Sequence, residues 1–296
     1  MKPVRQKRLH ETIDRVREKI EWNHSEESPI EKDKLRVQMC KQFHIKAKGD
    51  NEQKIRWRTA RTKELFLLLL QNREQVVNKE EIIELLWPEV DFERANAQLY
   101  TTVYHIRKVI KQLGDHFKLE NNINGYILFT RDTEIDVDQW EDTIQTLPQL
   151  NNETIVEYEQ AMKLYSDNYL KDHHYVWAIP EAERLDRKWV KIALEISQQY
   201  EKSGKLTEAY HWNKYICTRY PDVEEAHFAV MRYLAAQGKC AYVDHQYRTL
   251  VDSLEEDLGV QPSGYVTKWY NKWKAQSGNI QLRVVRGEVE GYHEEV

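Results

Sequence analysis

The side chains best suited to binding chemistry lie between residues 94 and 111, where polar, basic and aromatic residues recur at helical spacing. They combine hydrogen-bonding tips with positive charge, the chemistry that contacts phosphates and the edges of nucleic-acid bases. The residues on this side are Arg94, Ala97, Thr101, Tyr104, His105 and Lys108, flanked by Arg107 and Lys111. An ordinary solvated face would look similar, because surface helices turn polar residues away from the core. Both interpretations stay open on this stretch alone.

The element that must position these side chains is the stretch 91–113. Its apolar residues Leu99, Val103, Ile106 and Ile110 recur at helical spacing, so at about 100° per residue they form one narrow stripe. We therefore expect one long helix, with the stripe on a core and the polar side exposed.

Length, composition and charge limit the class of protein. With 296 residues, of which 41% are hydrophobic, the chain can bury a sizeable core and favours two domains over one. A net charge of −5 means that any nucleic-acid surface must be local. No apolar run approaches the roughly 20 residues that span a bilayer, and the charged N-terminus lacks a signal-peptide core. We expect a cytoplasmic protein without a membrane partner.

Signals of an enzyme are missing from the sequence. Cys40, Cys217 and Cys240 are far apart and include no CxxC pair, which favours buried thiols over a disulfide framework or a zinc site. The sequence contains no Gly-rich phosphate loop and no nucleophile elbow. His173 and His174 lack the helical spacing of a metal site and favour a polar turn. We expect no catalysis, no cofactor and no metal.

The segments before the long helix predict a linker followed by a small sheet and two helices. Residues 2–20 form an amphipathic helical pattern, and residues 22–34 have linker composition. LRVQMCKQFHIKA and then KGDNEQKIRW predict a small antiparallel sheet. Thr59 or Thr62 can cap the helix RTKELFLLLLQN, and Asn78 can cap KEEIIELLWP.

After the long helix, HFKLENNINGYILFTRD predicts a hairpin. Its two extended runs flank Asn124-Gly125, a dipeptide that suits the positive φ angles of a tight turn. A winged helix-turn-helix domain has its elements in this order: two helices, a long basic helix and a hairpin.

From about residue 136 onward, apolar and aromatic residues recur at helical spacing in one segment after another. Gly204 and Gly238 lie 34 residues apart (238 − 204 = 34), and each follows a core residue, Tyr200 or Leu234, by four positions. That period is typical of tetratricopeptide-type (TPR-type) helical hairpins, which stack into an array with a groove. The tail from Ser277 onward lacks a helical stripe, and we expect it to be mobile.

Residues 35–135 resemble the OmpR/PhoB-type winged helix of the SARP and BTAD group of bacterial regulators. The matching stretches are WRTARTKELFLLLL, NKEEIIELLWPEV, ERANAQLYTTVYHIRKVI and NGYIL. The resemblance implies that 95–111 is the recognition helix, that 121–126 is the wing, and that Glu89 and Asp91 contact RNA polymerase. The expected DNA-binding residues are Arg94, Ala97, Thr101, Thr102, Tyr104, His105, Arg107, Lys108, Lys111, Asn122 and Asn124.

The wing departs from this family at one position. Many relatives carry an arginine where this chain has Asn122, which weakens the implied minor-groove contact or displaces it to Lys118 or Arg131.

Residues 136–272 resemble the bacterial transcriptional activator domain through YSDNYLKDHHYVWA, EEAHFAVMRYLAAQGK and LEEDLGVQP. Residues 2–20, with the pair Lys2-Pro3, resemble the end of a response-regulator receiver domain, and a plain linker helix is an equal alternative.

The expected fold is an α+β winged helix-turn-helix domain followed by an all-α TPR-like domain. We expect an N-terminal helix and linker at 1–34, the winged helix at 35–135, the activator domain at 136–276 and a mobile tail at 277–296. The implied function is that of a transcriptional regulator, with activation favoured over repression. Its expected partners are double-stranded promoter DNA, RNA polymerase, a second copy in a homodimer, and an upstream receiver domain or sensor kinase. The alternative is a protein-interaction scaffold whose winged helix is degenerate.

Overall fold

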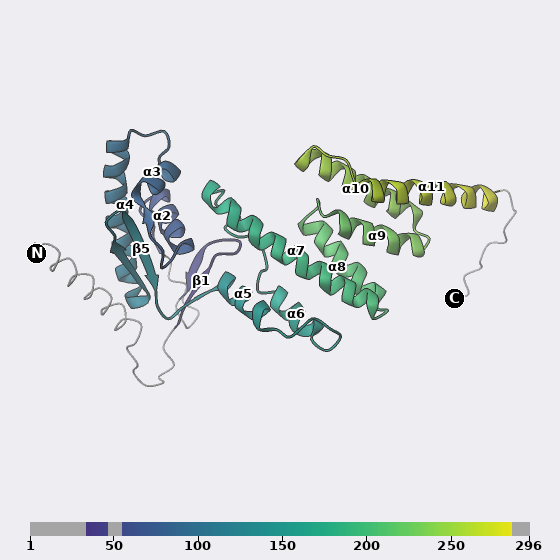
Figure 1. Cartoon of the computed structure of the whole chain (residues 1–296), viewed down its shortest axis with the longest axis horizontal. Coiled ribbons are helices and arrows are strands. Elements are labelled where there is room, and N and C mark those ends of the chain that lie inside the picture. Colours follow the sequence, from purple (N-terminus) through teal and green to yellow (C-terminus); the bar gives the residue numbers. More distant parts are fainter. Residues whose placement is uncertain (1–33, 47–54, 286–296) are drawn as a thin grey trace, which may run out of the picture. The chain divides into compact units, whose positions relative to one another are not determined.

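The computed structural model describes residues 34–46 and 55–285 of the chain (Figure 1). The helix expected at 2–20, most of the linker before Lys34 and the last part of the tail lie outside these residues. Contacts divide the chain into two compact units. Of the described residues, the first unit contains those up to Gln139 and the segment Ser166–Ala182, and the second contains Trp140–Tyr165 and those from Glu183 onward.

The first unit begins with a three-stranded sheet in the order β2-β1-β6. Strand β1 (Leu35–Gln38) pairs antiparallel with β2 (His44–Lys46) and parallel with β6 (Thr133–Ile135). An antiparallel pair was expected here, but the second extended run was placed too late in the sequence, since residues 55–57 form no strand. The parallel partner β6 was not expected, because it comes from beyond the hairpin.

Three helices follow, α2 (Ala60–Gln71), α3 (Lys79–Leu86) and α4 (Phe92–Gln112). Thr59 caps α2, because its hydroxyl accepts a hydrogen bond from the Thr62 amide at 3.1 Å. Asn78 occupies the N-cap position of α3 as expected, but its side chain makes no capping hydrogen bond. The leucine run of α2 is buried, and its Phe66 ring packs edge-on against Phe117 at 5.3 Å.

A second three-stranded sheet completes this unit after the short 3-10 helix η1 (Gly114–His116). Its order is β3-β5-β4, from β3 (Val77–Asn78), β5 (Gly125–Thr130) and β4 (Phe117–Asn121), and all pairs are antiparallel. Strands β4 and β5 form the expected hairpin, which we call the wing.

The segment Ser166–Ala182 also belongs to the first unit, although its sequence resembles the activator domain. Its backbone bonds to the stretch after β1, with the Leu170 amide donating to the Met39 carbonyl at 2.8 Å and the Lys41 amide to the Asn168 carbonyl at 2.9 Å. The short helix η2 (Val176–Ala178) follows within this segment.

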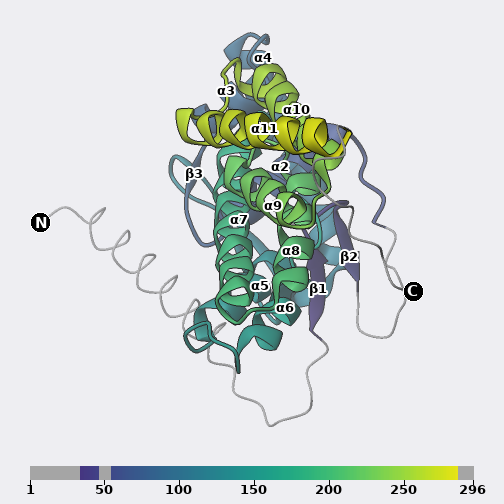
Figure 2. The same cartoon turned by 90° about the vertical axis from the view of Figure 1, so that its right-hand side faces the viewer.

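The second unit is helical in all its described elements. Its helices are α5 (Asp136–Thr146), α6 (Ile155–Met162), α7 (Ile179–Lys202), α8 (Leu206–Arg219), α9 (Glu224–Ala236), α10 (Cys240–Leu258) and α11 (Gly264–Val285), of which α5 and α7 begin in the first unit. Figure 2 shows α11 running at a large angle to α7 and α8. The helical region was expected to end at residue 276, but α11 continues to Val285.

The expected repeat is visible in the turns between helices. Gly204 and Gly238 have φ angles of 73° and 68°, which a side chain would strain. The lysine after each glycine donates its amide to the core residue five positions earlier, Tyr200 or Leu234, at 3.0 Å in both turns. Two helix ends 34 residues apart therefore share one geometry, as stacked helical hairpins require.

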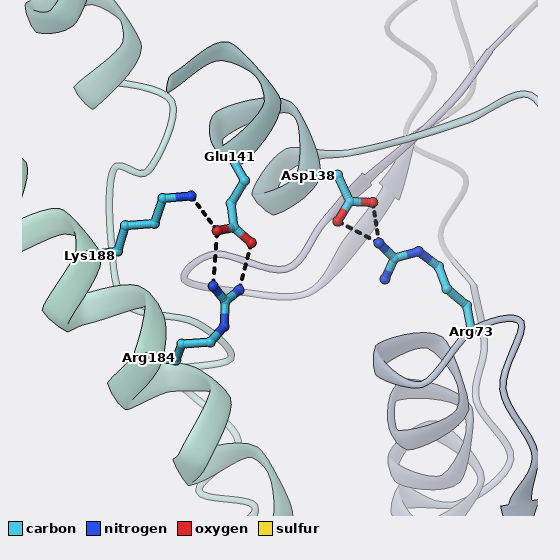
Figure 3. A network of polar contacts seen from close by, with 5 residues as sticks. All are labelled: Arg73, Asp138, Glu141, Arg184 and Lys188. Carbon is cyan, nitrogen blue, oxygen red and sulfur yellow. Dashed lines mark hydrogen bonds and ion pairs between the residues drawn. The ribbon is translucent and has the colours of Figure 1, made fainter. Parts of the chain in front are cut away.

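Ion pairs engage two residues in the first half of the short helix α5, Asp138 and Glu141 (Figure 3). In the first unit, Arg73 donates to both oxygens of Asp138 at 2.6 and 2.5 Å. In the second, Glu141 accepts two hydrogen bonds from Arg184, at 3.0 and 2.6 Å, and one from Lys188 at 2.6 Å. The Arg184 hydrogen bonds are the main cause that lowers the pKa of Glu141 to about 2.

Candidate nucleic-acid interface

Helix α4 is held by a cap at its start and by a buried stripe along its length. The Asp91 carboxylate accepts hydrogen bonds from the amides of Glu93 at 3.0 Å and Arg94 at 3.4 Å. Every residue of the stripe is buried, as the sequence predicted, namely Leu99, Val103, Ile106 and Ile110. The direction in which α4 turns its polar side is therefore fixed by the core.

The opposite side of α4 is exposed along five turns. The exposed residues are Arg94, Ala97, Thr101, Tyr104, Arg107, Lys108 and Lys111, and His105 is half-buried. The Lys108 ammonium lies 4.6 Å from the centre of the Tyr104 ring, and His105 packs edge-on against the same ring at 5.4 Å. The Thr101 hydroxyl donates to the Ala97 carbonyl at 3.0 Å and can still accept hydrogen bonds through its lone pairs. This side can supply charge, hydrogen bonds and flat apolar surface together.

Thr102 does not belong to this surface, and its inclusion among the expected DNA-binding residues was wrong. Its side chain is only 7% exposed, and its hydroxyl donates to the Gln98 carbonyl at 2.7 Å. Thr102 follows the exposed Thr101 by one position, and a step of about 100° is enough to carry it to the core side.

The wing lies beside one edge of this surface. Arg107 donates to the side-chain oxygen of Asn121, at the end of β4, at 2.9 Å. On the same edge, Tyr100 is 51% exposed, and the Lys79 ammonium lies 5.4 Å from the centre of its ring. Tyr100 was not among the expected site residues, although its spacing of four residues from Tyr104 was a usable signal.

The turn of the wing differs from the expected one. The Asn122 amide donates to the Gly125 carbonyl at 2.9 Å, so the turn residues are Ile123 and Asn124. Neither Asn124 nor Gly125 has a positive φ angle. A Cβ atom at Gly125 would lie 2.1 Å from the Val77 carbonyl oxygen, so the glycine is needed for the close approach of β3.

The two asparagines proposed for the wing therefore sit on either side of its tip. Asn122 is half-buried and Asn124 is exposed. The alternative cations of the wing have acidic neighbours, since Lys118 pairs with Glu120 at 2.9 Å and Arg131 with Asp132 at 3.6 Å.

A basic cavity lies along the other edge of α4. It has a volume of about 570 Å³, and its lining residues are Arg56, Trp57, Arg58, Thr59, His105, Lys108, Val109 and Gln112. Trp57 packs against Phe66 with the ring centres 5.1 Å apart, so its ring contributes to the core as well as to the cavity. Arg56 and Arg58 are exposed and were missed, although the basic run KIRWR was visible in the sequence. The cavity places three long cations and a half-buried histidine around an opening that an anion could enter.

The acidic connector between α3 and α4 is exposed at both residues expected to contact polymerase. Glu89 is exposed, whereas the exposed carboxylate of Asp91 also caps α4. Asp91 therefore has a structural role whatever its partner.

Within the described parts of the chain, the structure contains no group of His, Cys, Asp or Glu that could hold a metal ion. His173 lies in a turn and stacks on Tyr175 at 5.3 Å. Burial is the main cause that raises the pKa of Cys217 to about 12, so this thiol is unreactive. No described helix has the length and apolar character needed to cross a membrane.

Comparisons with known proteins agree with this architecture. Residues 53–127 match the family described as "Transcriptional regulatory protein, C terminal", and residues 139–272 match the "Bacterial transcriptional activator domain". Both are domains of transcription regulators rather than enzymes. A search of curated proteins found no match.

A solved structure of EmbR from Mycobacterium tuberculosis, in complex with a low-affinity phosphopeptide, has a similar fold. The TM-score is 0.59 at 17% sequence identity, over 83% of this chain and 66% of that one. The chain thus spans slightly less than two thirds of the EmbR chain, and the likeness concerns the fold alone. The chain thus carries an OmpR/PhoB-type DNA-binding domain of transcriptional regulators over residues 53–127, followed by a bacterial transcriptional activator domain over residues 139–272.

Proposed function

We propose that the chain binds promoter DNA sequence-specifically and activates transcription, with α4 in the major groove and the wing at the minor groove. The observation that carries the proposal is the two-sided character of α4, in which a fully buried apolar stripe leaves the basic, hydroxyl-bearing side exposed. A helix of this kind fits the major groove in width and can present side chains to base edges.

The exposed residues divide by chemistry into two roles. Thr101, Tyr104 and His105 have short or rigid polar tips that suit hydrogen bonds to bases, and Ala97 leaves room for a thymine methyl group. Arg94, Arg107, Lys108 and Lys111 supply charge for phosphates. Arg56 and Arg58 extend the charge to the next stretch of backbone along the basic cavity.

The dependence of DNA binding on salt tests this proposal. Each lost phosphate contact should flatten the slope of log K against log[salt] by about 0.9. We expect Lys108→Ala to weaken binding to all duplexes and to flatten the slope by about that amount. The matched control is Lys191→Ala, which removes an exposed lysine from α7. Equal slopes for Lys108→Ala and the parent chain would contradict the proposal.

Contact with RNA polymerase through Glu89 and Asp91 is the activating part of the proposal. Charge reversal in Glu89→Lys should abolish activation in transcription assays while leaving promoter binding intact. At Asp91, the suitable variant is Asp91→Asn, because an asparagine keeps a capping oxygen for α4 and removes only the charge. Full activation by both variants would exclude this contact.

We further propose that the chain acts as a homodimer and receives its signal through an upstream receiver domain, a sensor kinase or the helical unit. A homodimer would bind two half-sites about one helical turn of DNA apart. Footprinting on a selected duplex distinguishes one protected half-site from two, and one alone would exclude the dimer.

The alternative function, a protein-interaction scaffold, draws support from a cavity of about 510 Å³ in the helical unit. Its lining includes the stacked rings of Tyr210 and Tyr233, 4.5 Å apart, together with Arg232 and Trp269. A gel-shift against genomic fragments separates the two functions, because a scaffold would retain DNA only weakly and without preference for sequence.

A further inference from the structure

The most exposed large apolar side chain of the described residues lies at the tip of the wing. Ile123 is 89% exposed. Single exposed apolar residues are common on protein surfaces and need no explanation by themselves. Ile123 differs from them in being held rigidly and in lying beside a surface that we propose to bind DNA.

Hydrogen bonds on both sides fix the tip. The Asn122 amide donates to the Gly125 carbonyl at 2.9 Å and closes the turn. The Lys79 amide, at the start of α3, donates to the Asn124 carbonyl at 2.9 Å. With Gly125 seated against β3, the turn has little freedom to fold Ile123 back onto the protein. Little ordering entropy would therefore be lost if this side chain entered a groove.

The tip is continuous with the proposed interface. Arg107 of α4 donates to Asn121, which pairs with Tyr126 at the last rung of the hairpin before the tip. No lysine or arginine occurs between residues 119 and 130. The cations near the tip, Lys79 and Arg107, come from α3 and α4, so the tip itself supplies none to read the negative potential of a narrow minor groove. It presents an apolar side chain between two amides instead.

We propose that Ile123 enters the minor groove as an apolar wedge, partly unstacks one base step and bends the duplex toward the major groove. Isoleucine is one of the side chains that proteins insert in this way, and the cost is lowest at flexible pyrimidine–purine steps. Asn122 and Asn124 flank the wedge and can hydrogen bond to acceptors on the groove floor. The inference rests on the proposed function and adds that specificity at the wing comes from deformability of the duplex.

The probes for the test are duplexes selected from a random library by the full wild-type chain. Their end-to-end distance, measured by energy transfer between terminal dyes, reports bending, and 2-aminopurine at the step below the wing reports unstacking. The variants are Ile123→Ala, Ile123→Leu and Ile123→Arg. The matched control is Val176→Ala, which shortens an apolar side chain that is 76% exposed on η2.

We expect Ile123→Ala to lose about tenfold in affinity, the effect of losing one buried aliphatic side chain, together with the bend and the 2-aminopurine signal. Ile123→Leu should keep all three, because leucine is also an effective wedge. Ile123→Arg should retain affinity but lose the bend, since an arginine binds a narrow groove without unstacking it. Val176→Ala should behave like the parent chain.

If the Ile123→Ala variant and the parent chain bind specific duplexes equally well and bend them equally, the proposal of an apolar wedge is refuted. The proposed DNA-binding function would then still stand. Recovery of no specific duplex from the library would overturn both. Because the tip is exposed, folding should be unaffected, and equal thermal melting of the variants serves as the check.

Discussion

Replacement of Gly125 by alanine should loosen the wing far more than the same replacement at Gly114. The new Cβ atom would lie 2.1 Å from the Val77 carbonyl oxygen and 2.8 Å from the Val77 carbonyl carbon. Ordinary contact begins at 3.4 Å, so β3 would have to retreat by about 1.3 Å (3.4 − 2.1). Strand β3 has only two residues, and both pair with β5, so this movement would separate the strands.

The expected cost is about 2–4 kcal/mol, from overpacking and from the ladder hydrogen bonds that weaken. Amide hydrogen exchange of the full chain measures it locally, and the amides of β4 and β5 should exchange about 30-fold faster or more. The matched control is Gly114→Ala. Gly114 has a φ angle of 69° and no atom within 4 Å of its added Cβ, so only backbone strain of about 1 kcal/mol is expected there.

DNA binding provides a second readout for Gly125→Ala, because Ile123 and Asn124 would lose their fixed position. Affinity for a selected duplex should fall, whereas Gly114→Ala should change it little. Exchange of β4 and β5 that is no faster in Gly125→Ala than in Gly114→Ala would refute the reasoning.

The remaining predictions concern Glu141 of the helical unit and Thr102 of α4. The pKa of Glu141 is lowered in the folded chain from the ordinary 4.5 to about 2, so its ion pairs stabilise fully above pH 4.5 and lose this effect as the pH falls toward 2. In urea unfolding, Glu141→Gln should therefore cost about 1–3 kcal/mol at pH 7, and the difference from the parent chain should shrink below pH 4.5. A constant difference down to pH 3 would contradict this. Thr102→Ala should lower stability by about 1 kcal/mol and leave the selected DNA sequences unchanged, since its hydroxyl is buried. A change in the preferred DNA sequence would contradict this and would show that Thr102 contributes to DNA binding.

The sequence predicted best what depends on local periodicity. The stripe of α4 and the paired turns at Gly204 and Gly238 follow from spacings of a few residues, and the structure confirms both. A helical repeat fixes the direction of every side chain once its core positions are known. Thr102 was misassigned although the same periodicity indicates its side, because it follows Leu99 by three residues and precedes Ile106 by four.

The pairing of strands that lie far apart in the chain could not be predicted from the sequence. The dipeptide Asn124-Gly125 suggested a turn with positive φ, but Gly125 is required by a strand from far earlier in the chain. The parallel pairing of β6 with β1 and the return of Ser166–Ala182 to the first unit have the same cause. Such contacts depend on tertiary packing, which no local pattern encodes.

The basic cavity was missed for a different reason. Arg56 and Arg58 are visible as charges in the sequence, but their proximity to His105 and Lys108 arises only when α2 and α4 pack together. Tyr100 was missed because an aromatic residue at the edge of a helix face suits a core as well as a surface.

The most direct test of the account is whether a change on the outer side of α4 alters the DNA sequence that the chain selects. Thr101→Ala removes an exposed hydroxyl that donates to the carbonyl four residues earlier, and Thr218→Ala on α8 removes an exposed hydroxyl with the same bond. Selection from a random duplex library should give the same consensus for the parent chain and Thr218→Ala, and a consensus relaxed at one base pair for Thr101→Ala. The claim that α4 reads the promoter would be contradicted if the parent chain, Thr101→Ala and Thr218→Ala all select the same consensus. Tyr104→Ala and His105→Ala would have to select that consensus as well.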